Sequence, residues 1–300
     1  MSLDMTDKIT YSFVIPHKNS PTLLRRCLDS IPQRNDVEVI VVDNNSSDDI
    51  VDIKKLPGHE REDVSIIRDN ESIGGGGARN TGLAKTKGKW VLFADADDYY
   101  LDGFLNGLDA FSSSNNDVVY FNFRNLQNGK ETELPFLLRG LKDAYSNQKD
   151  NQELLRYKFS APWNKMISRE FLEHYHITFE DCEVGNDILF NCQVGYHAQK
   201  IEIINKKLYN YIIHEGSVTT SKMKNIAFYL CRFRHHYQQN AFYDFVNHPE
   251  WKRNIMVIIL SFLKKYGISQ TIYALFILVF NFGNIKREKN LIVDKVLGKL

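Results

Sequence analysis

The 300-residue sequence lacks a strong charge of either sign, because 38 lysines and arginines are balanced by 37 aspartates and glutamates. The formal net charge is therefore only +1. A chain with this balance exerts no long-range attraction on nucleic acid, and any anion binding must come from a local group of side chains. We expect no nucleic-acid partner.

Cysteine is also scarce, and the four residues are Cys27, Cys182, Cys192 and Cys231. They form no CxxC motif and lack the spacing of a zinc site. Two histidine pairs, at positions 174 and 176 and at positions 235 and 236, have no convincing metal-site spacing either. Free thiols in a reduced compartment are the plain expectation.

No apolar run reaches the roughly 20 residues that a membrane-spanning helix needs. The longest, Ile272–Phe282, is interrupted only by Asn281. The N-terminus lacks the basic and apolar regions of a secretory signal. Because basic residues flank the apolar run, it forms either a buried helix or a helix lying on a membrane surface. We expect a cytoplasmic protein, at the inner face of the membrane in the second case.

The first 127 residues alternate strand and helix patterns. Predicted strands cover 11–16, 37–43, 64–68, 90–94 and 118–122, and predicted helices cover 23–31, 47–55, 78–86 and 100–111. This alternation is typical of βαβ units and predicts an α/β fold with a mostly parallel sheet. Beyond residue 127 the rhythm changes: a polar stretch at 128–150 precedes predicted helices at 168–175 and 187–196, strands at 201–204 and 208–213, and helices from 225 onward.

Polar clusters follow three of the predicted strands: PHKN at 16–19, DNNS at 43–46 and DADD at 95–98. Ligands of open α/β sheets bind beyond the carboxyl ends of the strands, so these clusters are expected to meet at one edge. The carboxylates of Asp95, Asp97 and Asp98 repel one another unless a cation or hydrogen bonds neutralise them. Hard oxygen ligands suit Mg²⁺ or Mn²⁺, whereas the alternative is an acidic turn that caps the next helix.

Three further features carry a chemical and a plain interpretation. The run from Gly74 to Gly77, followed by Arg79, either brings backbone N–H groups and a guanidinium to a phosphate or is a flexible loop. Asp43 either accepts hydrogen bonds from a ribose or base, or caps a turn. Asp187 opens a predicted helix, so it is either an N-cap or a general base that takes the proton of an acceptor hydroxyl.

The order of motifs resembles the family-2 glycosyltransferases, which have the GT-A fold. The resemblance rests on FVIPHKN at 13–19, VEVIVVDNNSSDD at 37–49, NESIGGGGARNTG at 70–82 and WVLFADADD at 90–98. Asn44 and Asn45 stand where the family usually has a second acid and a glycine. The resemblance implies nucleotide contacts by Pro16, Lys18, Asn19, Asp43, Asn45, Asn70, Gly74, Arg79 and Asp95.

Later segments extend the likeness to about Thr220. APWNK at 161–165 resembles a stretch on the acceptor side, and GNDILFN at 185–191 resembles a base motif in which Asn186 replaces the usual glutamate. Asp187 is then the base candidate, and Trp163, Lys165 and Asn186 are acceptor candidates. YNYIIHEGSVTT at 209–220 resembles a closing segment but lacks its arginine. His214 of this segment is a further candidate metal ligand, in addition to Asp97 and Asp95.

The resemblance therefore implies a GT-A domain at 1–222, with a nucleotide-binding half at 9–127 and an acceptor half at 128–222, before a helical appendage at 223–300. It implies an inverting transfer from a nucleotide-sugar, commonly a UDP-sugar, to a hydroxyl of a glycan or lipid-linked acceptor. The expected cofactor is a divalent metal, Mn²⁺ or Mg²⁺. Two alternatives stay open: nucleotidyl transfer, and a non-catalytic carbohydrate-binding protein on the same fold.

Overall fold

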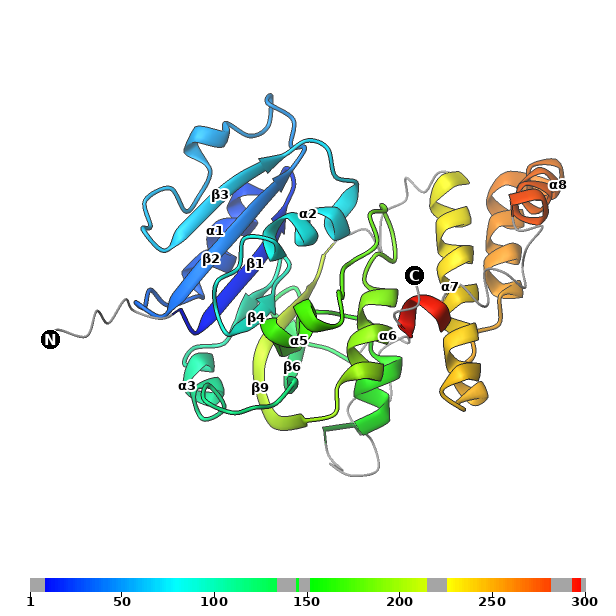
Figure 1. Cartoon of the computed structure of the whole chain (residues 1–300). Coiled ribbons are helices and arrows are strands. Elements are labelled where there is room, and N and C mark those ends of the chain that lie inside the picture. Colours follow the sequence, from blue (N-terminus) through cyan, green and yellow to red (C-terminus); the bar gives the residue numbers. More distant parts are fainter. Residues whose placement is uncertain (1–8, 134–143, 146–151, 215–225, 282–292, 298–300) are drawn as a thin grey trace, which may run out of the picture.

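The computed structural model describes residues 9–133, 144–145, 152–214, 226–281 and 293–297 (Figure 1). Its sheet has nine strands in the order β3-β2-β1-β4-β8-β6-β9-β5, and β7 pairs with β6. The strands are β1 Tyr11–His17, β2 Val37–Asn44, β3 Val64–Asp69, β4 Trp90–Phe93, β5 Tyr99–Tyr100, β6 Val118–Gln127, β7 Lys130–Glu131, β8 Lys165–Ser168 and β9 Ile201–Ile213. The α-helices are α1 Pro21–Asp29, α2 Gly74–Leu83, α3 Phe104–Asp109, α5 Arg169–His174, α6 Ile188–His197, α7 Ile226–Phe245 and α8 Met256–Asn281.

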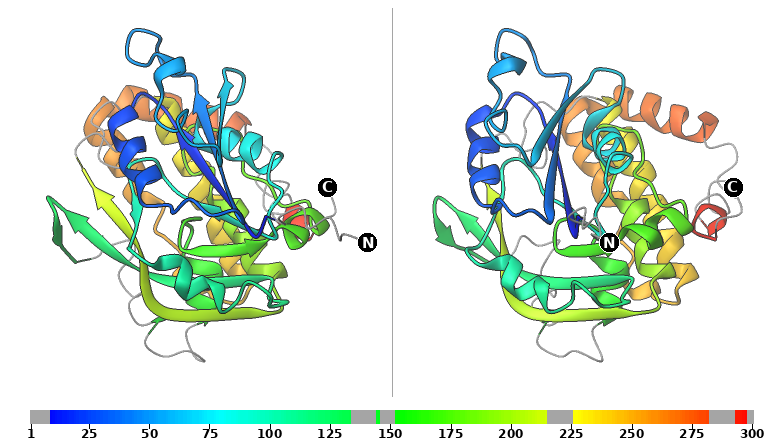
Figure 2. Two further views of the ribbon diagram at one scale, coloured as in Figure 1. Left: turned by 90° about the vertical axis from the view of Figure 1, so that its left-hand side faces the viewer. Right: turned by 60° about the vertical axis from the view of Figure 1, so that its left-hand side comes forward.

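The N-terminal half is the predicted parallel sheet, with β3, β2, β1 and β4 side by side. Alternate residues of β2 face opposite sides of a sheet that is covered on both faces. Val39 and Val41 join the main core cluster with Leu24 and Leu28 of α1, whereas Ile40 and Val42 form a separate cluster with Ala78 of α2. Figure 2 shows α1 and α2 on opposite sides of these strands. This double burial explains why the β2 sequence is almost continuously apolar.

The other half of the sheet curls and changes direction. β8 is antiparallel to both β4 and β6, and β9 runs parallel to β6. The two strands predicted at 201–204 and 208–213 are one continuous strand, because an irregularity opposite Asn122 absorbs the polar residues between them. The central sheet is thus mostly parallel, as predicted, with antiparallel pairing added around β8.

One predicted helix is wrong and two begin elsewhere. The segment 47–55 forms turns that end in a short 3₁₀ helix, Ile53–Lys55, rather than an α-helix. Asp52 is extended and caps this turn through Lys54 N, and Leu56 precedes a proline, which disfavours helical geometry. α2 starts at Gly74, earlier than predicted, and the helix predicted from 100 starts at Phe104 because β5 occupies residues 99–100.

Of the C-terminal helices, α7 packs on α6, and α8 packs on α7 (Figure 1). Ile188 and Leu189 of α6, Phe242 of α7 and Val296 belong to one apolar cluster. The imidazole Nε2 of His197 lies 2.5 Å from the carbonyl oxygen of Val296. The predicted boundary at 222/223 falls outside the described residues.

α8 is broken at Gly267, where φ is 78° and ψ is 178°. One helical stretch, Pro249–Phe276, is long and apolar enough to cross a membrane by length and composition. Of its apolar 18-residue segment, 17% is buried. The break leaves helical segments of roughly 16 and 21 Å at 1.5 Å per residue. Each is shorter than the roughly 30 Å hydrocarbon core of a bilayer, so this geometry favours an appendage over a straight span.

Candidate active site

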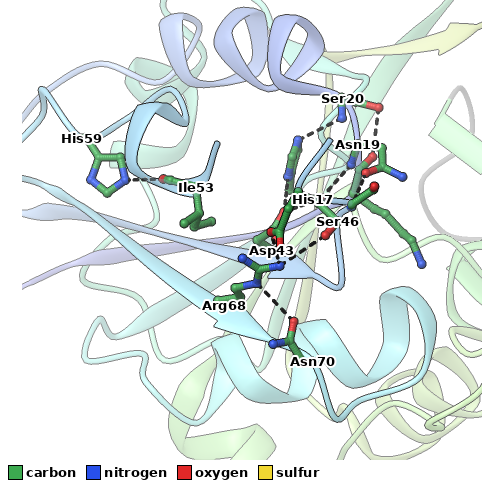
Figure 3. A network of polar contacts seen from close by, with 12 residues as sticks. His17, Asn19, Ser20, Asp43, Ser46, Ile53, His59, Arg68 and Asn70 are labelled. Atoms are coloured by element: carbon green, nitrogen blue, oxygen red, sulfur yellow. Dashed lines mark hydrogen bonds and ion pairs between the residues drawn. The ribbon is translucent and has the colours of Figure 1, made fainter. Parts of the chain in front are cut away.

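The polar clusters meet at the carboxyl edge of the sheet, because the parallel register places His17 opposite Asp43. Figure 3 shows the network that results. His17 Nδ1 lies 2.7 Å from Asp43 Oδ1, and the hydroxyl of Ser46 donates to the same oxygen at 2.6 Å. The backbone N–H of Ser20 donates to His17 Nε2 at 3.1 Å, so the ring proton is on Nδ1 and points to Asp43. Asp43 is therefore a buried carboxylate with a fixed orientation.

Asn19 ties the first two polar clusters together, and a second asparagine, Asn45, shares its backbone geometry. Asn19 and Asn45 have φ of 54° and 56°, a left-handed geometry that asparagine tolerates. The side-chain oxygen of Asn19 accepts from Ser47 N at 2.9 Å, and the backbone N–H of Asn19 donates to Ser46 Oγ at 2.8 Å. Lys18 and Asn45 remain exposed beside this network. The predicted nucleotide side of the site is thus a rigid loop pair with solvent-facing polar groups.

The remaining predicted nucleotide residues differ in exposure. Pro16 is half-buried at the end of β1. Asn70 is exposed and accepts from Arg68 Nε at 3.3 Å, on the rim drawn in Figure 3. Their nucleotide contacts stay predictions.

The acidic cluster divides into one structural and two accessible carboxylates. Oxygen atoms of Asp95, Asp97 and Asp98 lie within 4.8 Å of one another. Asp98 is buried and accepts from Tyr209 Oη at 2.9 Å and from Ile212 N at 2.7 Å. Burial, together with the two neighbouring carboxylates, holds the pKa of Asp98 well above its usual range. Asp98 thus anchors β9 to the end of β4.

Asp95 and Asp97 keep the exposure that a ligand needs. Their side chains are 30% and 32% exposed. His214, which follows β9, places Nε2 2.6 Å from Asp97 Oδ2. The structure therefore brings Asp97 close to both Asp95 and His214, and the clustered carboxylate oxygens suit a hard divalent cation such as Mg²⁺ or Mn²⁺. Arg26, which sequence analysis did not single out, donates to the backbone carbonyl of Asp97.

Arg79 joins the acidic cluster to the segment that carries Asp187. Its guanidinium donates to Asp95 Oδ1, and it donates to Asn186 Oδ1 at 3.3 Å. The guanidinium carbon also lies 5.4 Å from the ring centre of Phe179. Arg79 is 8% exposed, so these contacts hold it in one position. Two of the predicted groups are thereby linked across 107 positions of sequence.

Asp187 stands at the N-terminal boundary of α6, but its side chain makes no capping hydrogen bond. Asp187 thus occupies the N-cap position of α6 without using its carboxylate to cap the helix. Burial raises the pKa of Asp187 above its ordinary value, and the charge of Arg79 opposes that rise. A carboxylate with a raised pKa is a stronger base than an exposed aspartate, which suits proton abstraction at neutral pH.

The glycine run has a different environment from the one expected of a phosphate loop. A Cβ on Gly76 would lie 2.1 Å from the carbonyl oxygen of Glu180, and one on Gly77 would lie 2.4 Å from Asp181 Oδ1. The carboxylate of Asp181 accepts from Ile73 N at 2.6 Å, at the N-terminus of α2. Protein atoms therefore occupy the space against these glycines, and the carboxylate at this helix end belongs to the chain itself. Phosphate contact by Gly74 stays a prediction.

Gly76→Ala is expected to destabilise the protein by about 1–3 kcal/mol, because the new methyl group meets a backbone atom that cannot move aside. Gly107 of α3 provides the matched control, since a Cβ there would meet only the side chains of Leu208 and Lys206, at 3.4 Å or beyond. Gly107→Ala is expected to gain about 0.5–1 kcal/mol from reduced backbone entropy in the unfolded chain. Urea unfolding of both variants gives the comparison, and equal stabilities would contradict the close packing at Gly76.

The predicted acceptor residues lie deeper than expected. The ring of Trp163, 3% exposed, stacks on Tyr209 with centroids 4.9 Å apart. Lys165, 1% exposed, donates from Nζ to Ala161 O at 2.8 Å and to Asn191 Oδ1 at 2.6 Å. Burial lowers the pKa of Lys165 to about 7. Both side chains support the site from within the core, and their contact with an acceptor stays a prediction, as does that of Asn186.

Comparison with known proteins decides the family. Residues 12–176, more than half of the chain, match the family model described as glycosyl transferase family 2. The chain belongs to this family. The DADD cluster, the glycine run and the His17–Asp43 network all lie within the matched residues.

Similar proteins include bacterial glycosyltransferases. The chain is 28% identical over 227 residues to glycosyltransferase GlyA of Streptococcus pneumoniae, covering 71% of this chain and 32% of that protein. It is 30% identical over 223 residues to the GalNAc(5)-diNAcBac-PP-undecaprenol beta-1,3-glucosyltransferase of Campylobacter jejuni, covering 71% of this chain and 68% of that protein. It thus spans about a third of the first relative and two thirds of the second.

Among solved structures, S. aureus TarS 1–349 in complex with UDP is similar, with a TM-score of 0.59 and 19% identity. The match covers 84% of this chain and 66% of TarS 1–349. At this identity the likeness bears on the fold, which is the predicted α/β fold of GT-A type.

Proposed function

We propose that the protein is an inverting glycosyltransferase that moves a sugar from a nucleotide-sugar, a UDP-sugar, to a hydroxyl of a glycan or lipid-linked acceptor. One observation carries this proposal. The accessible carboxylates of Asp95 and Asp97 lie on one side of Arg79, and the segment that bears Asp187 lies on the other. A diphosphate and an acceptor hydroxyl then have separate places around a common centre.

Each side of this centre has a distinct role. Asp97, with Asp95 and His214, would hold a divalent cation, which supplies positive charge to neutralise a departing diphosphate. His17 and Ser46 hold the carboxylate of Asp43 in the orientation for contact with the nucleoside. The exposed residues Lys18 and Asn45 lie beside this network. Arg79 fixes the orientation of Asp95 and of Asn186.

Asp187 takes the proton of the acceptor hydroxyl as that oxygen attacks the anomeric carbon. The bond to the sugar forms on one face while the bond to the diphosphate oxygen breaks on the other, so the configuration inverts. The electron pair of the broken bond leaves with the diphosphate, and the proton stays on Asp187. No enzyme nucleophile is needed, and general-base assistance is typically worth about 10²–10⁴-fold.

The relatives support this assignment by class. GlyA is named a glycosyltransferase, and the C. jejuni protein is named a glucosyltransferase with an undecaprenol-linked substrate. TarS has been solved with UDP and with UDP-GlcNAc. We infer a role in cell-surface polysaccharide or glycan synthesis, at the cytoplasmic side of the membrane.

The proposal is tested by incubating the full-length chain and Mn²⁺ with a panel of UDP-, GDP- and dTDP-sugars and assaying the released nucleotide. Transfer or slow hydrolysis releases a nucleoside diphosphate from at least one donor. A second incubation supplies a nucleoside triphosphate and a sugar phosphate. Nucleotidyl transfer between them releases pyrophosphate from the triphosphate. A non-catalytic sugar-binding protein releases neither, so each alternative has its own outcome.

The second half of the appendage supports a membrane contact. Ile268 and Ile272 of α8 are 71% and 62% exposed, and Leu260 is 56% exposed. Lys264 and Lys265 are exposed close to them. Apolar side chains beside basic ones suit a surface of anionic lipid, where each basic residue contributes about 1 kcal/mol. We propose that α8 rests on such a surface, near a lipid-linked acceptor.

The full-length chain is expected to float with vesicles that contain anionic phosphatidylglycerol at low salt, and less so at high salt. Replacing both Leu260 and Ile272 with serine should abolish flotation. Ile50→Ser removes an exposed isoleucine, 57% exposed, from the opposite half of the chain and should leave flotation unchanged. An absence of flotation at low salt excludes the membrane contact.

A further inference from the structure

A second group of metal-binding side chains lies behind the Asp187 segment, away from the acidic cluster. Cys182, Cys231 and His235 each offer a ligand atom within 4.8 Å of the other two. Cys182 Sγ lies 3.8 Å from His235 Nε2, and Cys231 Sγ lies 3.8 Å from His235 Nδ1. Cys231 and His235 are one turn apart on α7, whereas Cys182 comes from the loop before α6. Because two of these residues are 53 positions apart in the sequence, their local spacing gives no sign of a site.

The surroundings of the imidazole are those of a bound histidine. Glu180 Oε2 lies 3.1 Å from His235 Nε2, with side chains only 12% and 2% exposed. A carboxylate that binds one imidazole nitrogen fixes the ring and leaves the other nitrogen for a metal. Here that other nitrogen is Nδ1, which faces Cys231.

The two cysteines share a backbone contact. The thiolate is the form of cysteine that binds metal, so each thiol would lose its proton on binding Zn²⁺. Both sulfurs also lie within 3.5 Å of the carbonyl oxygen of Val184, which holds them on the same side of the loop.

The backbone leaves room for this arrangement at one glycine. Gly185 has φ of 74°, and a Cβ there would lie 2.4 Å from His235 Nδ1. Position 185, which starts the GNDILFN segment, must therefore be a glycine, because a side chain there would collide with His235. The same loop is tied to the active site, because Asn186 donates to Cys182 O at 3.1 Å and accepts from Arg79.

We propose that Cys182, Cys231 and His235 form a zinc site that joins α7 to the loop bearing Asp187. Two sulfurs and an imidazole are soft ligands that select Zn²⁺ over Mg²⁺ or Mn²⁺, whereas the carboxylates of the acidic cluster have the opposite preference. A simple disulfide between the two cysteines would need neither the histidine nor its buried carboxylate partner. The zinc site stabilises the position of the base and takes no part in the transfer itself.

Cobalt(II) provides the test, because thiolate ligands give it a near-ultraviolet charge-transfer band that oxygen ligands do not. The full-length chain, reduced and then freed of metal, is expected to bind about one Co²⁺ with this band per chain, and Zn²⁺ should displace it. Cys231→Ala and Cys182→Ala should each lose the band. Cys192→Ala, which removes a buried thiol of α6 outside the cluster, should keep it, and so should Asp97→Asn.

A second measurement needs no variant. Zn²⁺ should protect Cys182 and Cys231 of the wild-type chain from alkylation by iodoacetamide, as read by peptide mass. No band in the reduced wild type, a band that survives both cysteine substitutions, or alkylation that Zn²⁺ does not slow would overturn the proposal. So would a Cys182–Cys231 disulfide without metal in the protein as purified. None of these outcomes bears on the glycosyltransferase proposal, since Asp97 and Asp187 lie outside the cluster.

Discussion

Asp187→Asn is expected to reduce turnover by about 10²–10⁴-fold and to leave UDP affinity close to that of the wild type. Asparagine keeps the size and hydrogen-bonding capacity of the side chain but cannot take a proton. The loss should appear in kcat, because the proton moves only on the way to the transition state. Turnover, UDP calorimetry and thermal unfolding of one preparation give all three quantities. Glu183→Gln, which removes an exposed carboxylate from the same loop, should retain full turnover.

The stability of this variant provides an independent check. The folded state raises the pKa of Asp187 above the ordinary value of 3.8, so it binds more protons than the unfolded chain between these two pKa values. Asp187 therefore costs stability as pH rises through that window, and the cost remains at neutral pH. Asp187→Asn should melt no lower than the wild type at pH 7. Near-wild-type turnover would exclude Asp187 as the base, although the family would stand.

The same pKa shift predicts the acid limb of the pH profile. Asp187 acts as a base only when ionised, so kcat falls as pH drops through its raised pKa. Arg79 and His235 favour the ionised form, whereas Asp95 disfavours it. The limb should therefore lie above the 3.8 of an ordinary aspartate and should be missing from the residual activity of Asp187→Asn.

Asp97→Asn is expected to weaken Mn²⁺-dependent UDP binding by about 10–100-fold, the range found when a metal site loses a supporting group. Asp97 is accessible, lies beside Asp95 and is oriented by His214. EDTA should weaken binding to the wild type by a similar factor and should add little to the effect of the substitution. Calorimetry with and without Mn²⁺ measures both.

Asp102→Asn serves as the control for this prediction, because it removes an exposed carboxylate just beyond the acidic cluster. Its UDP affinity should equal that of the wild type. If wild-type affinity were the same in EDTA and in Mn²⁺, a metal that bridges the protein and the diphosphate would be excluded. Asp98→Asn is unsuitable as a control because Asp98 holds β9 through Tyr209 and Ile212.

The strands and the shared edge of the site were predictable because they depend on local patterns. The runs that became β1, β2 and β4 are apolar over the lengths that a doubly covered sheet requires, and each is followed by polar residues. Parallel strands bring the polar residues that follow them to one edge of the sheet, whatever the conformation of the individual loops. The convergence of Asp43, Asp95 and Asp97 follows from this rule.

Contacts between distant segments were not predictable from the same patterns. The pairing of His17 with Asp43 depends on strand register, and that of Arg79 with Asn186 depends on how a loop returns to α2. Phosphate binding is one of the two interpretations that the sequence offers for the glycine run, because a phosphate and a backbone carbonyl can both approach closely only where a side chain is missing. Sequence alone does not distinguish these, and the structure places Glu180 and Asp181 against the glycines.

Single displacement with Asp187 as base is tested most directly by the anomeric configuration of the first-formed product. The wild-type chain is incubated with an α-linked UDP-sugar that it accepts, and the product is followed by proton NMR before the anomers equilibrate. Inversion predicts a β-configured product, with UDP released in equal amount. An α-configured product would contradict the mechanism, because a single displacement from the face opposite the diphosphate cannot retain the anomeric configuration.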